Sequence, residues 1–222
     1  FIEVPWRYRA ADGVNVCFYL GNEPEACVIH ISMGWRSTAE QWARVGHYGA
    51  SWGHLICLDG AILRHLQKNQ GGFHAGVSKY RNNKPRPYPT WPLFKGWEED
   101  GAPNVNVYTD SIEMEGQGEF TEAQKVSLKW LCQWLAQDRG YPYDRDHFPA
   151  HADIDLVDRA NDFGSPAYRE EIYKYLFEED SMTPEQAAKL DAVYAALTGG
   201  IPSTIEDWNA NGNSLLLGFA NE

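Results

Sequence analysis

Runs of apolar residues along the chain predict short strands separated by turns and helices. Residues 25–32 (Glu-Ala-Cys-Val-Ile-His-Ile-Ser) form a β-prone apolar run, which predicts a buried strand with His30 near its end. Residues 51–66 predict two further strands around an Asp59-Gly60 hairpin turn. Residues 1–20 contain shorter strand candidates, interrupted by a turn at 11–13.

Residues 105–115 predict a strand that carries acidic side chains on one of its faces. Side chains alternate along a strand, so Ile112 and Met114 face one side while Glu113 and Glu115 face the other. A carboxylate on a central strand is paired, ligated or catalytic, because burying an isolated charge is costly.

Two capping boxes mark the starts of predicted helices. Residues 37–40 (Ser-Thr-Ala-Glu) predict a helix to about Tyr48, and residues 121–124 (Thr-Glu-Ala-Gln) predict another to about Asp138. We expect the second helix to face the core with Ala123, Val126, Trp130, Leu131, Trp134 and Leu135. Two or three more helical segments are predicted beyond residue 164.

This order of elements predicts an α/β fold with a mixed central β-sheet flanked by helices. The length of 222 residues is enough for one domain with an appendage. We therefore expect a main domain over residues 1–164 and a helical C-terminal extension over residues 165–222. The extension would pack on the main domain, lead to a further module or mediate oligomerisation, and the oligomeric state stays open.

Composition and charge narrow the classes of partner. A net charge of −12 argues against nucleic acid and against anionic membranes, because both require a basic surface. No apolar stretch approaches the ~20 residues that a membrane helix needs. The first residues do not resemble a signal peptide. Four widely spaced cysteines favour reduced thiols over a disulfide framework: Cys17, Cys27, Cys57 and Cys132.

Residues 77–104 are rich in proline and aromatic residues and predict a long irregular loop. Trp91 and Trp97 are its candidate substrate-binding residues, since exposed aromatic rings stack on sugars. The alternative is a loop that packs on itself.

Residues 151–164 crowd candidate metal ligands into one segment. His151 and Asp162 would be two ligands of a divalent cation, with Arg159 between them. The competing interpretation is a solvated acidic loop in which the aspartates cap turns. A third ligand must then come from elsewhere in the chain.

Taken together, these motifs resemble the N-acetylmuramoyl-L-alanine amidases, a family of zinc hydrolases that includes phage endolysins, muropeptide amidases and peptidoglycan recognition proteins. The resemblance spans residues 25–164. It rests on Val28-Ile-His30, the hairpin at 51–66, Phe73-His-Ala-Gly76, Ser111-Ile-Glu-Met-Glu-Gly116, the helix start at 120–124, Ala150-His-Ala-Asp153 and Asn161-Asp-Phe-Gly164.

The resemblance implies a mechanism and a set of residues. One Zn²⁺ would be held by His30, His151 and Asp162, with Glu113 as general base and Arg159 as the group that stabilises the oxyanion. The bond cleaved would join N-acetylmuramic acid to L-alanine in peptidoglycan, at the bacterial cell wall. Weaker substrate-binding candidates are His74, His54, Trp91 and Trp97.

Three departures from the family pattern leave alternatives open. Phe163 replaces the proline of the family's Asp-Pro-Gly, and the interval from His151 is one residue longer, so Asn161 or Asp158 could take the place of Asp162. Arg159 stands where the family has lysine, which changes the donor geometry. Other interpretations are a non-catalytic peptidoglycan-binding protein and a soluble muropeptide amidase of wall recycling.

Overall fold

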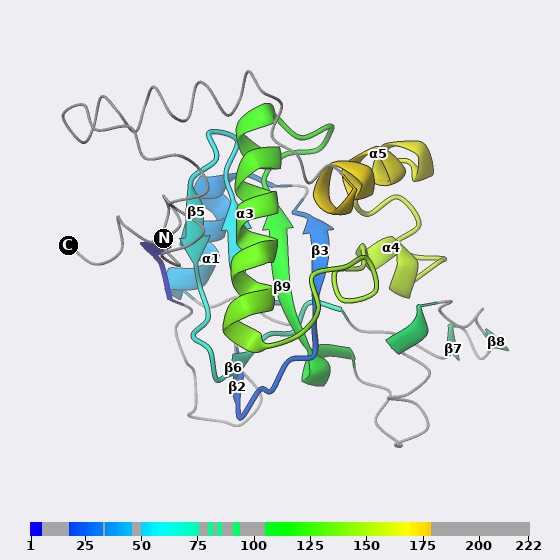
Figure 1. Ribbon diagram of the computed structural model, residues 1–222. Helices are drawn as coiled ribbons and strands as arrows, with labels where there is room; N and C mark the ends of the chain where they lie inside the picture. Colours follow the sequence, from blue (N-terminus) through cyan, green and yellow to red (C-terminus); the bar gives the residue numbers. More distant parts are fainter. Residues whose placement is uncertain are drawn as a thin grey trace, which may run out of the picture. The chain divides into compact units, whose positions relative to one another are not determined.

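The structure is a computed structural model that describes residues 1–5, 18–32, 34–45, 50–75, 80–81, 84–85, 91–93 and 105–178 (Figure 1). The chain divides into two units at Glu178. The second unit, Glu179–Glu222, lies outside the described residues, as do Cys17, Trp97 and the second predicted helix of the extension.

A five-stranded mixed sheet lies at the centre of the first unit, with the strand order β1-β5-β4-β9-β3. These strands are β1 (Ile2–Glu3), β5 (Ile62–Arg64), β4 (His54–Ile56), β9 (Thr109–Met114) and β3 (Ala26–Ile31). β9 pairs in parallel with both β3 and β4, whereas β4 and β5 form the predicted antiparallel hairpin. Two small antiparallel pairs lie outside this sheet: β2 (Tyr19–Leu20) with β6 (Gln70–Gly71), and β7 (Tyr80–Arg81) with β8 (Lys84–Pro85).

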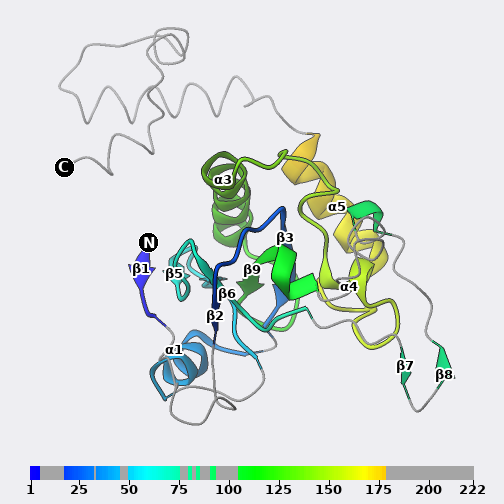
Figure 2. The same cartoon turned by 90° about the horizontal axis from the view of Figure 1, so that it is seen from below.

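Helices cover the two faces of the sheet (Figures 1 and 2). The helical elements are α1 (Arg36–Val45), the 3₁₀ helix η1 (Val105–Tyr108), α3 (Glu122–Arg139), α4 (His151–Ile154) and α5 (Pro166–Phe177). α3 and α5 pack on one face in a core cluster with Ile29 and Ile112. α1 packs on the other face, where Ala39 and Ala43 belong to a core cluster with Leu55. The mixed α/β fold predicted from the sequence is therefore confirmed.

Strand register assigns each side chain to a face. Glu113 is aligned with His30 on one side and with Leu55 on the other, so these residues share a face. Ile112 is aligned with Ile29 and His54, which therefore lie on the opposite face, under α3. The predicted split between Ile112 and Glu113 is confirmed.

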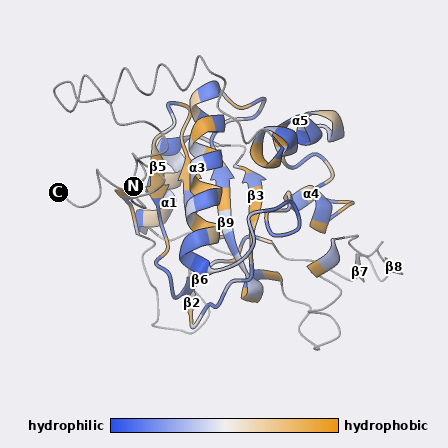
Figure 3. Cartoon of the chain, in the orientation of Figure 1, coloured by the Kyte–Doolittle hydropathy of each residue, from blue (hydrophilic) through white to orange (hydrophobic). Residues whose placement is uncertain are grey.

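Helix α3 has the predicted capping box, but its buried face differs from the prediction. Thr121 Oγ1 accepts a hydrogen bond from the Gln124 backbone, and Gln124 Oε1 accepts one from Thr121 N. Ala123 is exposed and Val126 is 61% exposed, so the assignment of these two residues to the core was wrong. The helix has both hydrophobic and hydrophilic residues along its length (Figure 3). Its buried residues are Gln124, Leu128, Leu131, Cys132, Leu135 and Ala136.

Two element starts also differ from the prediction. Helix α1 begins at Arg36, so Ser37 lies inside the helix and is not its N-cap. The Arg36 backbone N–H instead donates to Glu115 Oε1 at 2.7 Å, which ties the start of the helix to the end of β9. The predicted strand over 105–115 opens with η1 and becomes extended only at Thr109.

The first helix beyond residue 164 belongs to the same core as the sheet. Ile172, Tyr173 and Leu176 of α5 are buried in the cluster that also contains Ile29. Cys27, Cys57 and Cys132 are buried free thiols, as predicted. Within the described part of the chain, no helix has the length and apolarity needed to cross a membrane.

Gln124 generates the first prediction, because its buried side chain joins α3 to two strands. Its Nε2 donates to Ile56 O at 3.2 Å and to Glu115 O at 2.9 Å. Gln124→Ala removes the side-chain donor from the Glu115 carbonyl and one of the two donors from the Ile56 carbonyl, which keeps its bond from Glu115 N–H. It also removes half of the capping box, so we expect urea denaturation to show a loss of about 2–4 kcal/mol. The exposed Gln133→Ala on the same helix should change stability by less than about 0.5 kcal/mol. Equal losses in the two variants would contradict this role.

Candidate functional site

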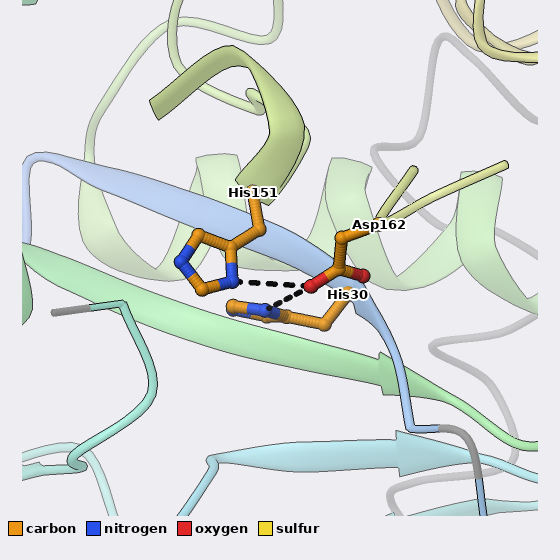
Figure 4. A group of neighbouring side chains, drawn as sticks. All are labelled: His30, His151 and Asp162. Carbon is orange, nitrogen blue, oxygen red and sulfur yellow. Dashed lines mark hydrogen bonds and ion pairs between the residues drawn. The ribbon is translucent and has the colours of Figure 1, made fainter. Parts of the chain in front are cut away.

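His30, His151 and Asp162 come from three separate elements and meet at one point (Figure 4). His30 lies near the end of β3, His151 begins α4, and Asp162 lies in the loop before α5. Ala150 forms an isolated parallel bridge with Ile29, which brings the start of α4 beside β3. One ligand atom from each of the three side chains lies within 4.8 Å of the other two.

The two imidazoles approach the same carboxylate oxygen. Asp162 Oδ2 lies 3.1 Å from His151 Nδ1 and 3.6 Å from His30 Nδ1. The other oxygen, Oδ1, accepts a hydrogen bond of 2.8 Å from the Ile31 backbone N–H. Both histidines are 3% exposed, and the Asp162 side chain is 8% exposed. The alternatives Asn161 and Asp158 are exposed, so the structure brings Asp162 to the histidines.

Burial and mutual contact set the charge states of these residues. Burial and the neighbouring His151 lower the pKa of His30 to about 4, against the opposing effect of Asp162. Burial alone would raise the pKa of Asp162, but the hydrogen bond from His151 and the close approach of His30 hold it well below its ordinary value. Neutral imidazoles and an ionised carboxylate are the states in which these groups bind a metal.

This donor set fits a divalent metal ion. Two imidazole nitrogens and one carboxylate oxygen are the protein ligands of a group of catalytic zinc sites, which leave a position for water. In addition, His151 Nε2 is buried without a hydrogen-bond partner among the described residues. In the described part of the chain, His30, His151 and Asp162 are the group of histidine, cysteine or acidic side chains whose ligand atoms lie close enough together to hold a metal ion.

His74 supports the ring of His30 from the side away from Asp162. His74 Nδ1 lies 3.2 Å from His30 Nε2, and His74 Nε2 lies 3.3 Å from Thr109 Oγ1. Asn106 Oδ1 accepts hydrogen bonds from the backbone N–H groups of His74 and Ala75. Sequence reasoning missed Asn106 and Thr109, because a short polar side chain near a strand gives no signal of such a contact.

Glu113 occupies the position next to His30 on the adjacent strand. Burial, followed by the charge of Asp162, raises its pKa well above the ordinary value, while Arg159 opposes the shift. Its Oε2 is buried and makes no hydrogen bond within the described part of the chain. A carboxyl group with a raised pKa, beside a candidate metal site, is suited to accept and return protons.

A surface cavity of about 230 Å³ borders the cluster and is lined by Ile31 and residues 157–162. Arg159 is exposed in this lining, and its positive charge acts on both Glu113 and His30. The positively charged side chain of Arg159 therefore lines the same cavity as the candidate metal ligand Asp162.

Two of the weaker substrate-binding candidates lie elsewhere. His54 faces α3 on the opposite side of the sheet from His30, beside a separate cavity of about 210 Å³ that Trp134 and Arg139 also line. Trp91 is 3% exposed in a core cluster, and its indole N–H donates to Asp146 O. Strand alternation thus places His54 on the other face of the sheet, and Trp91 is buried in a core cluster. Their part in substrate binding stays a prediction.

Comparisons with known proteins identify the family and the fold. The sequence profile described as N-acetylmuramoyl-L-alanine amidase matches residues 20–165, more than half of the chain. No curated protein matches the sequence.

Solved structures share the fold at low identity. The N-acetylmuramoyl-L-alanine amidase LysC from Clostridium intestinale URNW is 19% identical, with a TM-score of 0.51 over 77% of this chain and 93% of its own. A selenomethionine derivative of AmpD is 20% identical, with a TM-score of 0.52 over 79% of this chain and 93% of its own. A mutant endolysin from Bacillus subtilis is 15% identical, with a TM-score of 0.51 over 79% of this chain and 97% of its own.

His54 yields a prediction about acid stability. Burial, then the charges of Arg139 and Arg64, lower the pKa of His54 from 6.5 to about 3. The folded protein therefore binds a proton on His54 less readily than the unfolded chain does. The stability that depends on neutral His54 is fully present above pH 6.5 and is lost as the pH falls toward 3. The loss should be ~1.4 kcal/mol per pH unit, or about 2 kcal/mol between pH 6.5 and 5. His54→Leu should lose correspondingly less stability over this interval in urea denaturation. Identical pH slopes for the wild type and the variant would contradict the assignment.

Proposed function

The chain belongs to the N-acetylmuramoyl-L-alanine amidase family, and we propose that it is a zinc-dependent enzyme that cleaves the amide bond between N-acetylmuramic acid and L-alanine in peptidoglycan. The observation that carries this proposal is the convergence of His30, His151 and Asp162 next to the buried carboxyl group of Glu113. These residues combine a complete metal ligand set with a group that can move protons.

His30, His151 and Asp162 are the residues that would hold the ion. A bound Zn²⁺ supplies a Lewis acid, which lowers the pKa of water toward ~7 and polarises a carbonyl group. Asp162 is fixed for this role by the Ile31 backbone N–H, and His30 by its contact with His74. Such contacts behind the ligands set the orientation of the ligands.

Glu113 carries the proton transfers. Its carboxylate would accept a proton from the attacking water and then donate that proton to the leaving amine of L-alanine. Burial keeps the proton affinity of Glu113 high, which favours acceptance of the proton from water. Arg159, at the edge of the 230 Å³ cavity, would stabilise the negative charge that develops on the carbonyl oxygen.

We assign the activity to polymeric peptidoglycan, with lysis of the bacterial cell wall as the outcome. A soluble muropeptide from wall recycling is the competing substrate on the same fold. Parallel digestion of whole sacculi and of purified muropeptides, followed by mass spectrometry, separates the two: a lytic enzyme releases stem peptides from sacculi, whereas a recycling enzyme acts on the muropeptides alone.

Metal removal tests the proposed zinc site. Exhaustive treatment with a chelator should abolish release of stem peptides from peptidoglycan, and Zn²⁺ added back should restore it, because the ion supplies the Lewis acid that polarises the carbonyl group. Mass spectrometry of the released peptides measures the cleavage. Full activity in protein shown by elemental analysis to be free of metal would refute the mechanism.

Substitution of Glu113 tests its proposed role in proton transfer. Glu113→Gln keeps the shape of the side chain but cannot accept the proton, so we expect kcat to fall by about 10²–10⁴-fold. Zinc binding should be retained, because Glu113 is not among the three ligands. The exposed Glu119→Gln is the matched control and should keep the wild-type rate. A Glu113→Gln enzyme with unchanged kcat would remove the assigned role.

A further inference from the structure

Phe163 follows the candidate ligand Asp162 and has an unusual backbone conformation. Among the residues that the structure describes, it is the one non-glycine residue with a positive φ, 77°. Gly164 continues the left-handed turn with a φ of 81°. A positive φ is unfavourable for a bulky aromatic residue and persists only where the surrounding structure compensates for it.

Burial of the Phe163 ring supplies that compensation. The ring is fully buried, with its centroid 5.1 Å from that of Phe120 and 5.9 Å from that of Tyr173. The next position is also constrained by packing, since a Cβ on Gly164 would lie 2.7 Å from Tyr168 Cδ1. The turn is therefore held against the core that α3 and α5 share.

The same turn fixes the direction of Asp162. The Asp162 backbone N–H donates to Arg159 O at 2.8 Å, and the Gly164 N–H donates to Asn161 O at 3.0 Å. These bonds close the loop on its exposed side, while the Phe163 ring anchors it to the core. Between the two, the Asp162 carboxylate is directed toward the histidines and the Ile31 N–H (Figure 4).

We propose that Phe163 is a positioning residue for the metal site: burial of its ring holds the left-handed turn that directs the Asp162 carboxylate at His30 and His151. The inference rests on the proposed function, since it presumes that these side chains bind zinc. On this inference, the apolar side chain of Phe163 controls the affinity of the site for zinc without being one of its ligands.

The left-handed turn also makes proline unsuitable at this position. Proline fixes φ near −65°, far from the 77° observed for Phe163. The family pattern Asp-Pro-Gly has proline at the position of Phe163. This chain would therefore direct the Asp162 carboxylate through a different local backbone conformation. Phe163→Pro should consequently damage the site and not restore a family feature.

Zinc titration of the full 222-residue chain by isothermal calorimetry tests the proposal. Phe163→Ala and Phe163→Pro should weaken zinc binding by roughly 10–100-fold, the range for residues that orient metal ligands. Phe163→Leu, which keeps a large apolar side chain, should recover part of the affinity. Phe163→Gly accepts the left-handed backbone without strain but lacks the ring, so it should fold and still bind zinc weakly.

Leu131→Ala is the matched control, because Leu131 is fully buried in the same cluster but lies on α3, which provides no ligand. It should lower the melting temperature of the metal-free protein while leaving zinc affinity unchanged. Circular dichroism of each metal-free variant identifies the folded proteins to be titrated.

The outcomes separate the inference from the proposed function. If the wild type binds zinc and Phe163→Gly binds it equally well, the positioning role is wrong while the zinc site stands. Equal weakening by Leu131→Ala would reduce Phe163 to general core packing and would also overturn the inference. A wild type that binds no zinc would overturn the proposed function itself, and the inference with it.

Discussion

The parallel pairing of β3 with β9 is the constraint on which the site depends. Its register aligns His30 with Glu113, so a metal-ligand candidate and a proton-transfer candidate share one face of the sheet. A slip of one residue would turn one of them to the opposite face, under α3, because strand side chains alternate. The backbone ladder therefore sets the distance between the two groups before any loop contributes.

The loops then add the remaining groups to this edge of the sheet. The bridge between Ala150 and Ile29 places His151 beside β3, and the Ile31 N–H receives the carboxylate of Asp162. Each of these contacts uses the backbone of β3, so the strand is both the carrier of one ligand and the support of the other two. Beneath the site, Phe163 and the buried residues of α5 belong to one core cluster.

Burial gives the cluster its chemistry as well as its geometry. An ionised carboxylate is costly to bury, but Asp162 is surrounded by two imidazoles and a backbone N–H that stabilise its charge. Glu113 lacks such partners among the described residues and instead has a raised pKa. Asp162 and Glu113 thus differ in proton affinity because their surroundings differ. This difference suits Asp162 to the proposed role of metal ligand and Glu113 to the proposed role of proton carrier.

The sequence alone determined the elements that local chemistry specifies. The apolar run at 25–32, the turn at Asp59-Gly60 and the Thr121–Gln124 capping box all form where the pattern placed them, because strand alternation, turn geometry and caps are properties of neighbouring residues. The candidate ligands were also identified by residue type and by the resemblance. Their chemistry is carried by the side chains themselves.

Only the tertiary structure decided which of those residues meet. It separated His54 from His30 by strand register, buried Trp91 in a core cluster and chose Asp162 over its neighbour Asn161. The left-handed conformation of Phe163 could not be predicted either, because it is unfavourable locally and depends on distant aromatic rings. These outcomes depend on contacts between residues far apart in the chain, which no local pattern encodes.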